Sequence, residues 1–153
     1  MITFRQADLN DELLLFRWKN DPVALQQSFH SDPVALKDHQ AWFRSKLEDP
    51  NHHFYVFEQH GEPAGLVRFD RKATRTVIGI IVDPEHRGQQ LGAHMLEQAT
   101  ADYLAQFPRS VLHAYIKKDN FASLRSFARA GFHLQEAAAE NQGVLMIKTH
   151  VPG

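Results

Sequence analysis

The chain lacks three features whose absence limits what it can be. Its 153 residues include no cysteine, so disulfides, cysteine-ligated metals and a cysteine nucleophile are excluded. No stretch approaches the roughly 18 consecutive apolar residues that a membrane-spanning helix requires. The formal net charge of -1 gives no long-range attraction for nucleic acid or an anionic membrane. Any anionic ligand must therefore be held by local groups.

The opening segment, MITFRQADLNDELLLF, also lacks the marks of a targeting signal. It has no basic region followed by an apolar core, and its acidic residues are not typical of organelle transit peptides. We therefore expect a cytoplasmic protein with neither a membrane nor a nucleic acid as partner.

Histidine, in contrast, is abundant, with ten residues in the chain. His52 and His53 are adjacent, and His86 and His94 flank a glycine-containing loop. Neither pair has the spacing of an HExxH motif or of a compact cluster of histidine and carboxylate ligands. The sequence therefore predicts no metal site.

The hydropathy pattern predicts alternating helices and strands in one mixed α/β domain spanning residues 1–153. Seven strands and four helices are expected. The strands lie near residues 2–5, in a hairpin over 52–70 that turns at 61–63, at 76–83, at 110–116, and on either side of 141–143. The helices begin near Asp8 or Asn10, at Asp32 and Pro33, near Gln90, and after Asn120.

The pattern also predicts the end of the first helix, the packed face of the second helix and the place of one strand in the sheet. The first helix is expected to stop at Asp21 and Pro22, so that ALQQSFHSD forms a loop. The second helix should place Leu36, His39 and Phe43 on one packed face. The strand TVIGIIVD is apolar on both faces, which indicates a central place in the sheet.

The segment VDPEHRGQQLGAHML joins that central strand to the following helix. The first amides of a helix have no internal acceptor, and the helix dipole adds partial positive charge there. Glycines at 88 and 92 allow close approach to the backbone, and Arg87 can bind a phosphate. The segment matches neither GxGxxG nor a Walker loop, so a plain strand-to-helix turn is the alternative.

A second segment, DNFASLRSFARAGF, follows one helix and one strand later. Together the two segments resemble the pyrophosphate loop and the Asn-containing segment of the GNAT superfamily of acetyl-CoA-dependent N-acetyltransferases. The resemblance covers nearly the whole chain. It implies a mostly antiparallel sheet, acetyl-CoA as acetyl donor, no metal, and N-acetyltransferase activity.

The resemblance also implies which residues bind acetyl-CoA. The backbone of Ile80 and Val82 would pair with the pantetheine arm as an added strand does. Asn120 would contact the cofactor, with Ser123 one turn later and Phe127 alongside; for Asn120 a simple helix cap is the alternative. The amides expected to hold the pyrophosphate belong to Arg87, Gly88, Gln90, Leu91, Gly92 and Ala93.

Three positions depart from the family pattern. Gln90 stands where a second glycine is usual, which is tolerable if its φ is negative. Phe127 stands where many members carry a tyrosine that protonates the CoA thiolate, and Val77 where some carry a glutamate base. Tyr115 is the nearest candidate acid, with a structural role as the alternative, and His30 and His39 are the candidate bases.

The N-terminal half contains hints about the acceptor. FRWKNDP, SFHSD and LKDHQAWF resemble the GNAT branch that acetylates the 4-amino group of nucleotide-linked amino sugars in pseudaminic acid biosynthesis. In such a pocket Asn20 and Ser28 would bond hydroxyls, and Arg68 would meet a phosphate. Trp42 or Phe29 would stack on a base or ring. Helix packing is the alternative role for Trp42.

The leading hypothesis is direct acetyl transfer in a ternary complex to a small-molecule primary amine, with a UDP-linked amino sugar as candidate acceptor. One alternative is an N-acetyltransferase that acts on a protein N-terminus, an amino acid or another small amine. A second is a non-catalytic CoA-binding sensor. The sequence is compatible with either a monomer or a homodimer.

Overall fold

The computed structural model describes residues 2–29, 31–135 and 143–150, and its centre is a sheet of seven strands in the order β1-β2-β3-β4-β5-β7-β6. Neighbouring strands are antiparallel except for β4 and β5, which are parallel. This confirms the predicted mostly antiparallel sheet and the central place of the strand TVIGIIVD. The strands are β1 (Ile2–Gln6), β2 (His52–Gln59), β3 (Glu62–Arg71), β4 (Thr76–Val82), β5 (Val111–Lys117), β6 (His133–Gln135) and β7 (Gly143–Thr149).

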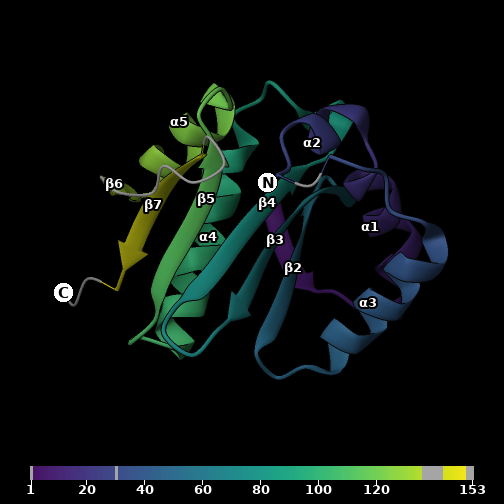
Figure 1. Ribbon diagram of the computed structural model, residues 1–153, viewed down its shortest axis with the longest axis horizontal. Coiled ribbons are helices and arrows are strands. Elements are labelled where there is room, and N and C mark those ends of the chain that lie inside the picture. Colours follow the sequence, from purple (N-terminus) through teal and green to yellow (C-terminus); the bar gives the residue numbers. More distant parts are fainter. Residues whose placement is uncertain (1, 30, 136–142, 151–153) are drawn as a thin grey trace.

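Helices cover both faces of the sheet (Figure 1). On one face α4 and α5 pack over the larger core, which includes Tyr55, Phe69 and Met95. On the other, α1 and α3 pack over a smaller core that includes Trp18 and Phe43. The α-helices are α1 (Glu12–Lys19), α2 (Pro22–Gln26), α3 (Leu36–Glu48), α4 (Leu91–Gln106) and α5 (Phe121–Arg129), with 3-10 turns η1 (Leu9–Asp11) and η2 (Pro84–His86).

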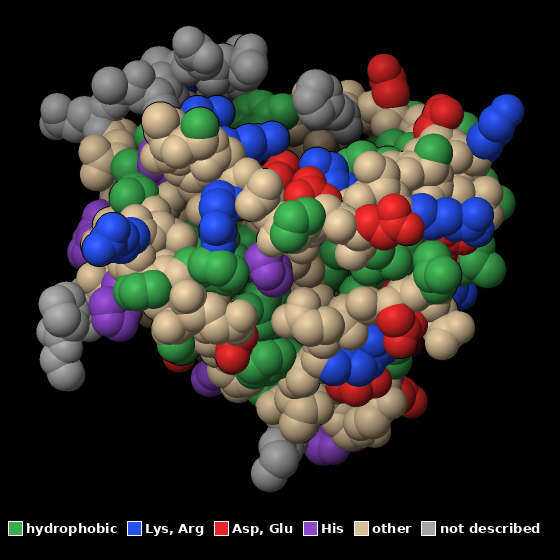
Figure 2. Space-filling view, turned by 90° about the horizontal axis from the view of Figure 1, so that it is seen from below, with side chains coloured by type: hydrophobic (Ala, Val, Ile, Leu, Met, Phe, Trp, Pro, Cys, Tyr) green, Lys and Arg blue, Asp and Glu red, His purple; other side chains and the backbone are tan. Residues whose placement is uncertain are grey.

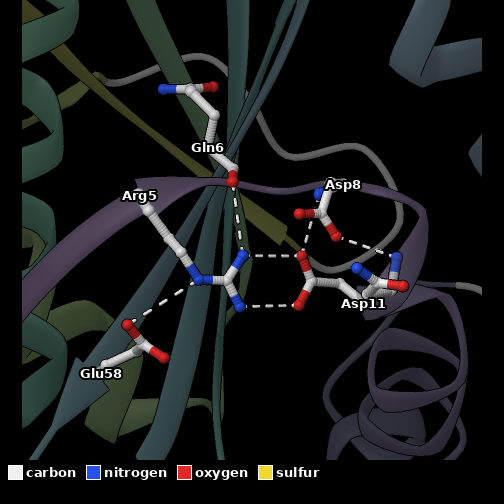
Figure 3. Close-up of polar contacts among 6 residues, drawn as sticks. Arg5, Gln6, Asp8, Asp11 and Glu58 are labelled. Carbon is white, nitrogen blue, oxygen red and sulfur yellow. Dashed lines mark hydrogen bonds and ion pairs between the residues drawn. The ribbon is translucent and has the colours of Figure 1, made fainter. Parts of the chain in front are cut away.

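A polar cluster fixes the start of α1 against β1 (Figure 3). The Arg5 guanidinium donates two hydrogen bonds of 2.8 Å to the buried Asp11 carboxylate, and Asp11 also accepts from the Asp8 amide at 2.9 Å. The bonds from Arg5 and Asp8 outweigh the effect of burial and lower the pKa of Asp11. This arrangement positions α1, whose last residues reach the site described below.

Two predicted boundaries in the N-terminal half are wrong. The segment after Asp21 was expected to be a loop, but it begins with a further helix, α2. Asp21 caps this helix by accepting a hydrogen bond from the Ala24 amide, and Pro22 is its first residue. The chain therefore has five α-helices among its described residues where four were expected. The next helix starts at Leu36 and not at Asp32, because Val34 is held outside it by the Asn20 side chain.

The two parallel strands separate along their length. Among the described residues, their pairing is confined to Thr76 with Leu112 and Val77 with His113. From residue 78 onward β4 pairs with β3 alone, and Figure 1 shows β4 and β5 diverging toward the end that carries α2 and α5. Backbone groups on one edge of β4 are therefore available in the middle of the sheet.

The surface is mixed in character. Seen from below, basic and acidic side chains alternate and histidines lie at separate places (Figure 2). Among the described residues, no group of three or more histidine and carboxylate side chains is placed to hold a metal ion. In the same part of the chain, every helix is too short or too polar to cross a membrane.

Candidate functional site

A cavity of about 1350 Å³ opens where β4 and β5 diverge. Its wall has two parts. We call the part formed by β4, the loop after it and the helices α4 and α5 the cofactor half; it contains Ile80, Val82, Arg87, Gly88, Gln90, Leu91, Gly92, Ala93, Asn120, Ser123 and Phe127. We call the part formed by Lys19, Ser28, Trp42, Arg68 and Tyr115 the acceptor half.

The loop between β4 and α4 is held by the Asp83 carboxylate. Asp83 accepts a 2.7 Å hydrogen bond from Trp18 Nε1 and a 3.1 Å bond from the Glu85 amide, and its Oδ2 lies 2.9 Å from His86 Nδ1. Burial raises the pKa of Asp83, but the bonds from His86 and Trp18 outweigh it and the net shift is downward. A fixed carboxylate at this point sets the path of the loop before the glycines begin.

Beyond Asp83 the loop presents the start of a long helix to the cavity. Gly88 has a φ of 80°, a left-handed conformation that favours glycine, and no atom would meet an added Cβ there. The helix α4 has 16 residues and no acidic residue in its first turn, so its terminal amides are available for an anion.

The structure corrects the expectation for Gln90. Its φ is +59° and not negative, so a non-glycine residue occupies the left-handed region at a cost of about 1 kcal/mol. Its side chain accepts a 2.8 Å hydrogen bond from Arg129 on α5. That bond links the loop to α5 and offsets part of the backbone cost.

Gly92 makes the approach of α4 and α5 possible. A Cβ at Gly92 would lie 2.9 Å from Ser126 Oγ, so even a small side chain would displace Ser126. Three arginines line the same cavity: Arg87 from the loop and Arg125 and Arg129 from α5. An open backbone, a helix N-terminus and three cations fit the pyrophosphate and phosphate groups of acetyl-CoA.

Arg87 itself is engaged in the structure as it stands. Its guanidinium donates to the Asp21 carboxylate of α2 at 2.7 Å. Burial raises the pKa of Asp21, but the hydrogen bond from Arg87 prevails and the pKa lies below its usual value. The predicted phosphate ligand is thus tied to the helix that the sequence did not predict.

On α5, Asn120 is both a helix cap and part of the cavity wall. Its Oδ1 accepts a 3.2 Å hydrogen bond from the Ser123 amide, which leaves its side-chain NH2 group as a donor. Phe127 lines the cavity but is only 2% exposed, and its ring packs against Phe132. A phenyl ring in this place supplies packing and no proton.

The acceptor half is built around the Trp42 ring. Lys19 Nζ lies 3.5 Å from the ring centroid and the Arg68 guanidinium carbon 5.5 Å from it. The three residues come from α1, α3 and β3, which the smaller core holds together. Ser28, at the end of α2, completes this part of the wall.

Tyr115 faces the cavity from β5. Its neighbours Ala114 and Ile116 point into the larger core, so Tyr115 lies on the opposite face of the strand and is 43% exposed. Val77 lines the cavity from β4 and offers no acid or base. Tyr115, the predicted acid, therefore lies on the cavity side of β5.

Two predicted site residues lie elsewhere. His39 is fully buried in the smaller core, stacks on Phe43, and has Nε2 2.9 Å from the Glu12 carbonyl oxygen. Burial lowers its pKa, and it does not line the cavity. Asn20 uses both ends of its side-chain amide on the backbone of Val34, at 2.8 Å each. These placements argue against the predicted roles, and His30 lies outside the described residues.

Sequence reasoning missed Lys19, Asp21 and Asp83. Lys19 and Asp21 flank Asn20 in FRWKNDP. The resemblance therefore pointed to the correct segment, but the predicted site residue, Asn20, is the neighbour of the residues that matter. For Asp83 the sequence predicts only the end of a strand. Its bonds to Trp18, 65 residues earlier, could not be read from sequence.

Comparison with known proteins agrees with this geometry. The family described as "Acetyltransferase (GNAT) family" matches residues 13–132 of the chain. The chain is similar to N-acetyltransferase YfmK of Bacillus subtilis, with 29% identity over 117 residues that cover 76% of each protein. It is 33% identical over 102 residues to an L-2,4-diaminobutyric acid acetyltransferase of Streptomyces anulatus, covering 61% of this chain and 58% of that protein.

The fold recurs in solved structures. The spermidine N-acetyltransferase of Vibrio cholerae, in complex with CoA and spermine, superposes with a TM-score of 0.82 at 15% identity. The match covers 95% of this chain and 92% of that one. At this identity the likeness concerns the fold alone.

Proposed function

Because the chain belongs to the GNAT family and is an acetyl-CoA-dependent N-acetyltransferase, we propose that it transfers the acetyl group directly to a small-molecule primary amine in a ternary complex. One observation carries this proposal. The cavity between the diverging β4 and β5 joins the anion-binding loop to the acceptor half, so both substrates can be bound at once.

The cofactor half supplies the groups that hold acetyl-CoA. The amides of residues 87–93 and the nearby arginines would hold the pyrophosphate, and the free edge of β4 at Ile80 and Val82 would pair with the pantetheine arm. Acetyl-CoA supplies an acetyl thioester. Free backbone N–H groups on β4 can donate to the thioester carbonyl oxygen, which gains negative charge during transfer.

The acceptor half orients the amine. The neutral amine attacks the acetyl carbon, so a C–N bond forms, the C–S bond breaks, and the sulfur leaves as a thiolate. The amine loses one proton and the thiolate gains one. Tyr115 faces the same cavity and is the proton donor in this proposal. With no cysteine in the chain, the acetyl group does not pass through a cysteinyl thioester.

Two acceptor classes are candidates. A nucleotide-linked 4-amino sugar is supported by the resemblance of FRWKNDP, SFHSD and LKDHQAWF and by the presence of Ser28, Trp42 and Arg68 in the acceptor half. A diamino acid is supported by the similarity to the diaminobutyric acid acetyltransferase.

The test is a thiol-release assay with acetyl-CoA against a panel of amines, with the acetylated product identified by mass spectrometry. The panel contains UDP-linked 4-amino sugars, 2,4-diaminobutyrate, an aminoglycoside, spermidine and peptides. Acetylation of a small-molecule amine, with no acetylated protein formed when the acceptor is left out, supports the proposal. Turnover of peptides alone, or thiol release that no amine accelerates, would refute it.

A further inference from the structure

Two cations of the acceptor half share one aromatic support. The Lys19 ammonium and the Arg68 guanidinium both lie against the Trp42 ring, at 3.5 and 5.5 Å from its centroid. Cations attract the face of an aromatic ring but repel each other. The attraction of the Trp42 ring alone does not explain why two mutually repelling cations lie against it.

The protein gives this pair little counter-charge: Asp70, on the same strand as Arg68, acts on the Arg68 guanidinium without contacting it. Among the described residues, neither Lys19 nor Arg68 forms an ion pair or a hydrogen bond, whereas Arg5, Arg44 and Arg87 each bind a carboxylate within 3 Å. Burial, with a contribution from Arg68, lowers the pKa of Lys19 to about 8, and burial also lowers the pKa of Arg68. Partly buried cations that no carboxylate contacts are costly in the free protein.

The position of the pair relates it to the reaction. Arg68 lies on β3 opposite Gly79 of β4, and a Cβ at Gly79 would be 3.4 Å from Arg68 Nε. The absent side chain at Gly79 makes room for the guanidinium. A pantetheine arm bound along Val82 and Ile80 would bring the thioester toward Gly79, the next residue back along β4. Arg68, opposite Gly79, would then lie beside the acceptor amine.

The wall of the cavity contains little negative charge. Asp32 is the carboxylate that lines it within the described residues, against the cations Lys19, Arg68, Arg87, Arg125 and Arg129. Three of these cations belong to the cofactor half. Lys19 and Arg68 remain for the second substrate.

We propose that Lys19 and Arg68, supported by Trp42, form an oxyanion subsite, so that the preferred acceptor is an amine that also carries a phosphate or carboxylate group. This inference rests on the proposed function and names the class of its acceptor. Arg68 offers a planar pair of donors and Lys19 a compact charge, a combination that suits either oxyanion.

The first experiment compares acceptors in matched pairs that differ in the anionic group. The pairs are a UDP-linked 4-amino sugar with the methyl glycoside of the same sugar, and 2,4-diaminobutyrate with 1,3-diaminopropane. In each productive pair the anionic member should have the higher kcat/KM, by about 10- to 100-fold, the effect expected for hydrogen bonds to charged groups. The first pair tests a phosphate source and the second a carboxylate source.

The second experiment uses Lys19→Met and Arg68→Met, each with its charge-retaining counterpart, Lys19→Arg and Arg68→Lys. Removal of either charge should lower kcat/KM for the acceptor that carries the anionic group about 10-fold or more, and should leave kcat/KM for its counterpart without that group within about 2-fold. The charge-retaining variants should keep part of the preference. Arg75→Met, an exposed position outside the cavity, is the matched control.

Calorimetry with acetyl-CoA shows whether each variant is folded. Lys19 and Arg68 belong to the acceptor half, so a folded variant should bind acetyl-CoA with the affinity of the wild type. Equal turnover of the two members of every pair, or equal losses on both members in the Met variants, would overturn the oxyanion subsite while leaving acetyl transfer intact. The absence of any acetylated amine would instead refute the proposed function.

Discussion

The two halves of the cavity are built in different ways. The cofactor half is mostly backbone: a free strand edge, a left-handed Gly88 and the first turn of α4, with 16 residues behind it. The acceptor half is mostly side chains, and Lys19, Trp42 and Arg68 come from three separate elements.

This difference has a physical consequence. Backbone amides are present whatever the side chain, so Gln90 can supply the same amide as the usual glycine of the cofactor half. A side-chain site depends on each residue and on the packing beneath it. Substitutions in the two halves should therefore affect different measured quantities.

The largest effect is expected for Gly92→Glu in the cofactor half. The new side chain would collide with Ser126 and place a carboxylate beside the bound pyrophosphate. Acetyl-CoA affinity, measured by isothermal titration calorimetry, should fall about 100-fold or more. This is the loss expected when a carboxylate repels the pyrophosphate and disrupts its hydrogen bonds. Gly92→Ala is the control, with a smaller loss because Ser126 can rotate. Equal affinities of wild type and Gly92→Glu would contradict the placement of the pyrophosphate.

Tyr115→Phe tests the acceptor half without changing its shape. Loss of the hydroxyl should lower kcat about 10-fold, less than most general acids provide, because a thiol is a fair leaving group without help. Acetyl-CoA affinity should stay unchanged. A kcat equal to that of the wild type across the whole pH range would remove Tyr115 from the mechanism.

The charge on Lys19 should appear in the pH dependence of stability. Its pKa is about 8 in the folded chain, below the unfolded value of 10.5, so the folded state binds fewer protons between these values. The charged, partly buried ammonium thus costs stability below pH 8, and the cost is relieved as the pH rises toward 10.5.

Lys19→Met removes this cost. The variant should therefore gain stability over the wild type at pH 7, by about 1 kcal/mol once solvent screening is allowed for, and the gain should shrink by pH 10. Urea unfolding of both proteins at the two pH values measures it. A difference that does not change with pH would show that Lys19 has an ordinary pKa.

Asp21→Asn probes the contact between the halves. The amide can still cap α2, but it no longer competes with phosphate for the Arg87 guanidinium. Acetyl-CoA should bind about 3-fold more tightly, in line with the small free energy of a partly exposed ion pair. Weaker binding would mean that Asp21 holds Arg87 in its binding position.

Gln90→Gly should have the smallest effect. The substitution relieves the left-handed strain but gives the unfolded chain more freedom and loses the bond to Arg129. Stability should change by less than about 1 kcal/mol in thermal unfolding, and acetyl-CoA affinity should be kept. A large loss of affinity would show that the Gln90 side chain, and not its amide, serves the cofactor.

The same contrast explains what the sequence could and could not predict. The cofactor half follows from two contiguous segments, and its residues line the cavity as a group. The acceptor half depends on which side chains of α1 and α3 point to the cavity. Asn20 and Lys19 are neighbours, but only the packing shows that Asn20 is consumed by Val34 while Lys19 is available.

His39 shows where two sequence arguments conflicted. Its helical spacing with Leu36 and Phe43 predicted a packed face, and the structure places it fully buried in that core. Its chemistry suggested a base. Periodicity was the better guide, because the apolar core that fixes α3 takes a whole face of the helix.

The ion pair between Asp21 and Arg87 and the hydrogen bond from Trp18 to Asp83 both cross from the α1–α2 region to the anion loop. An exchange of the N-terminal region for that of a relative with another acceptor would break both contacts unless positions 83 and 87 changed too. Acceptor preference in this chain is therefore not freely interchangeable. Any lineage that altered it by recombination would have had to restore, through compensating substitutions, the support of the Asp83 carboxylate that holds the loop.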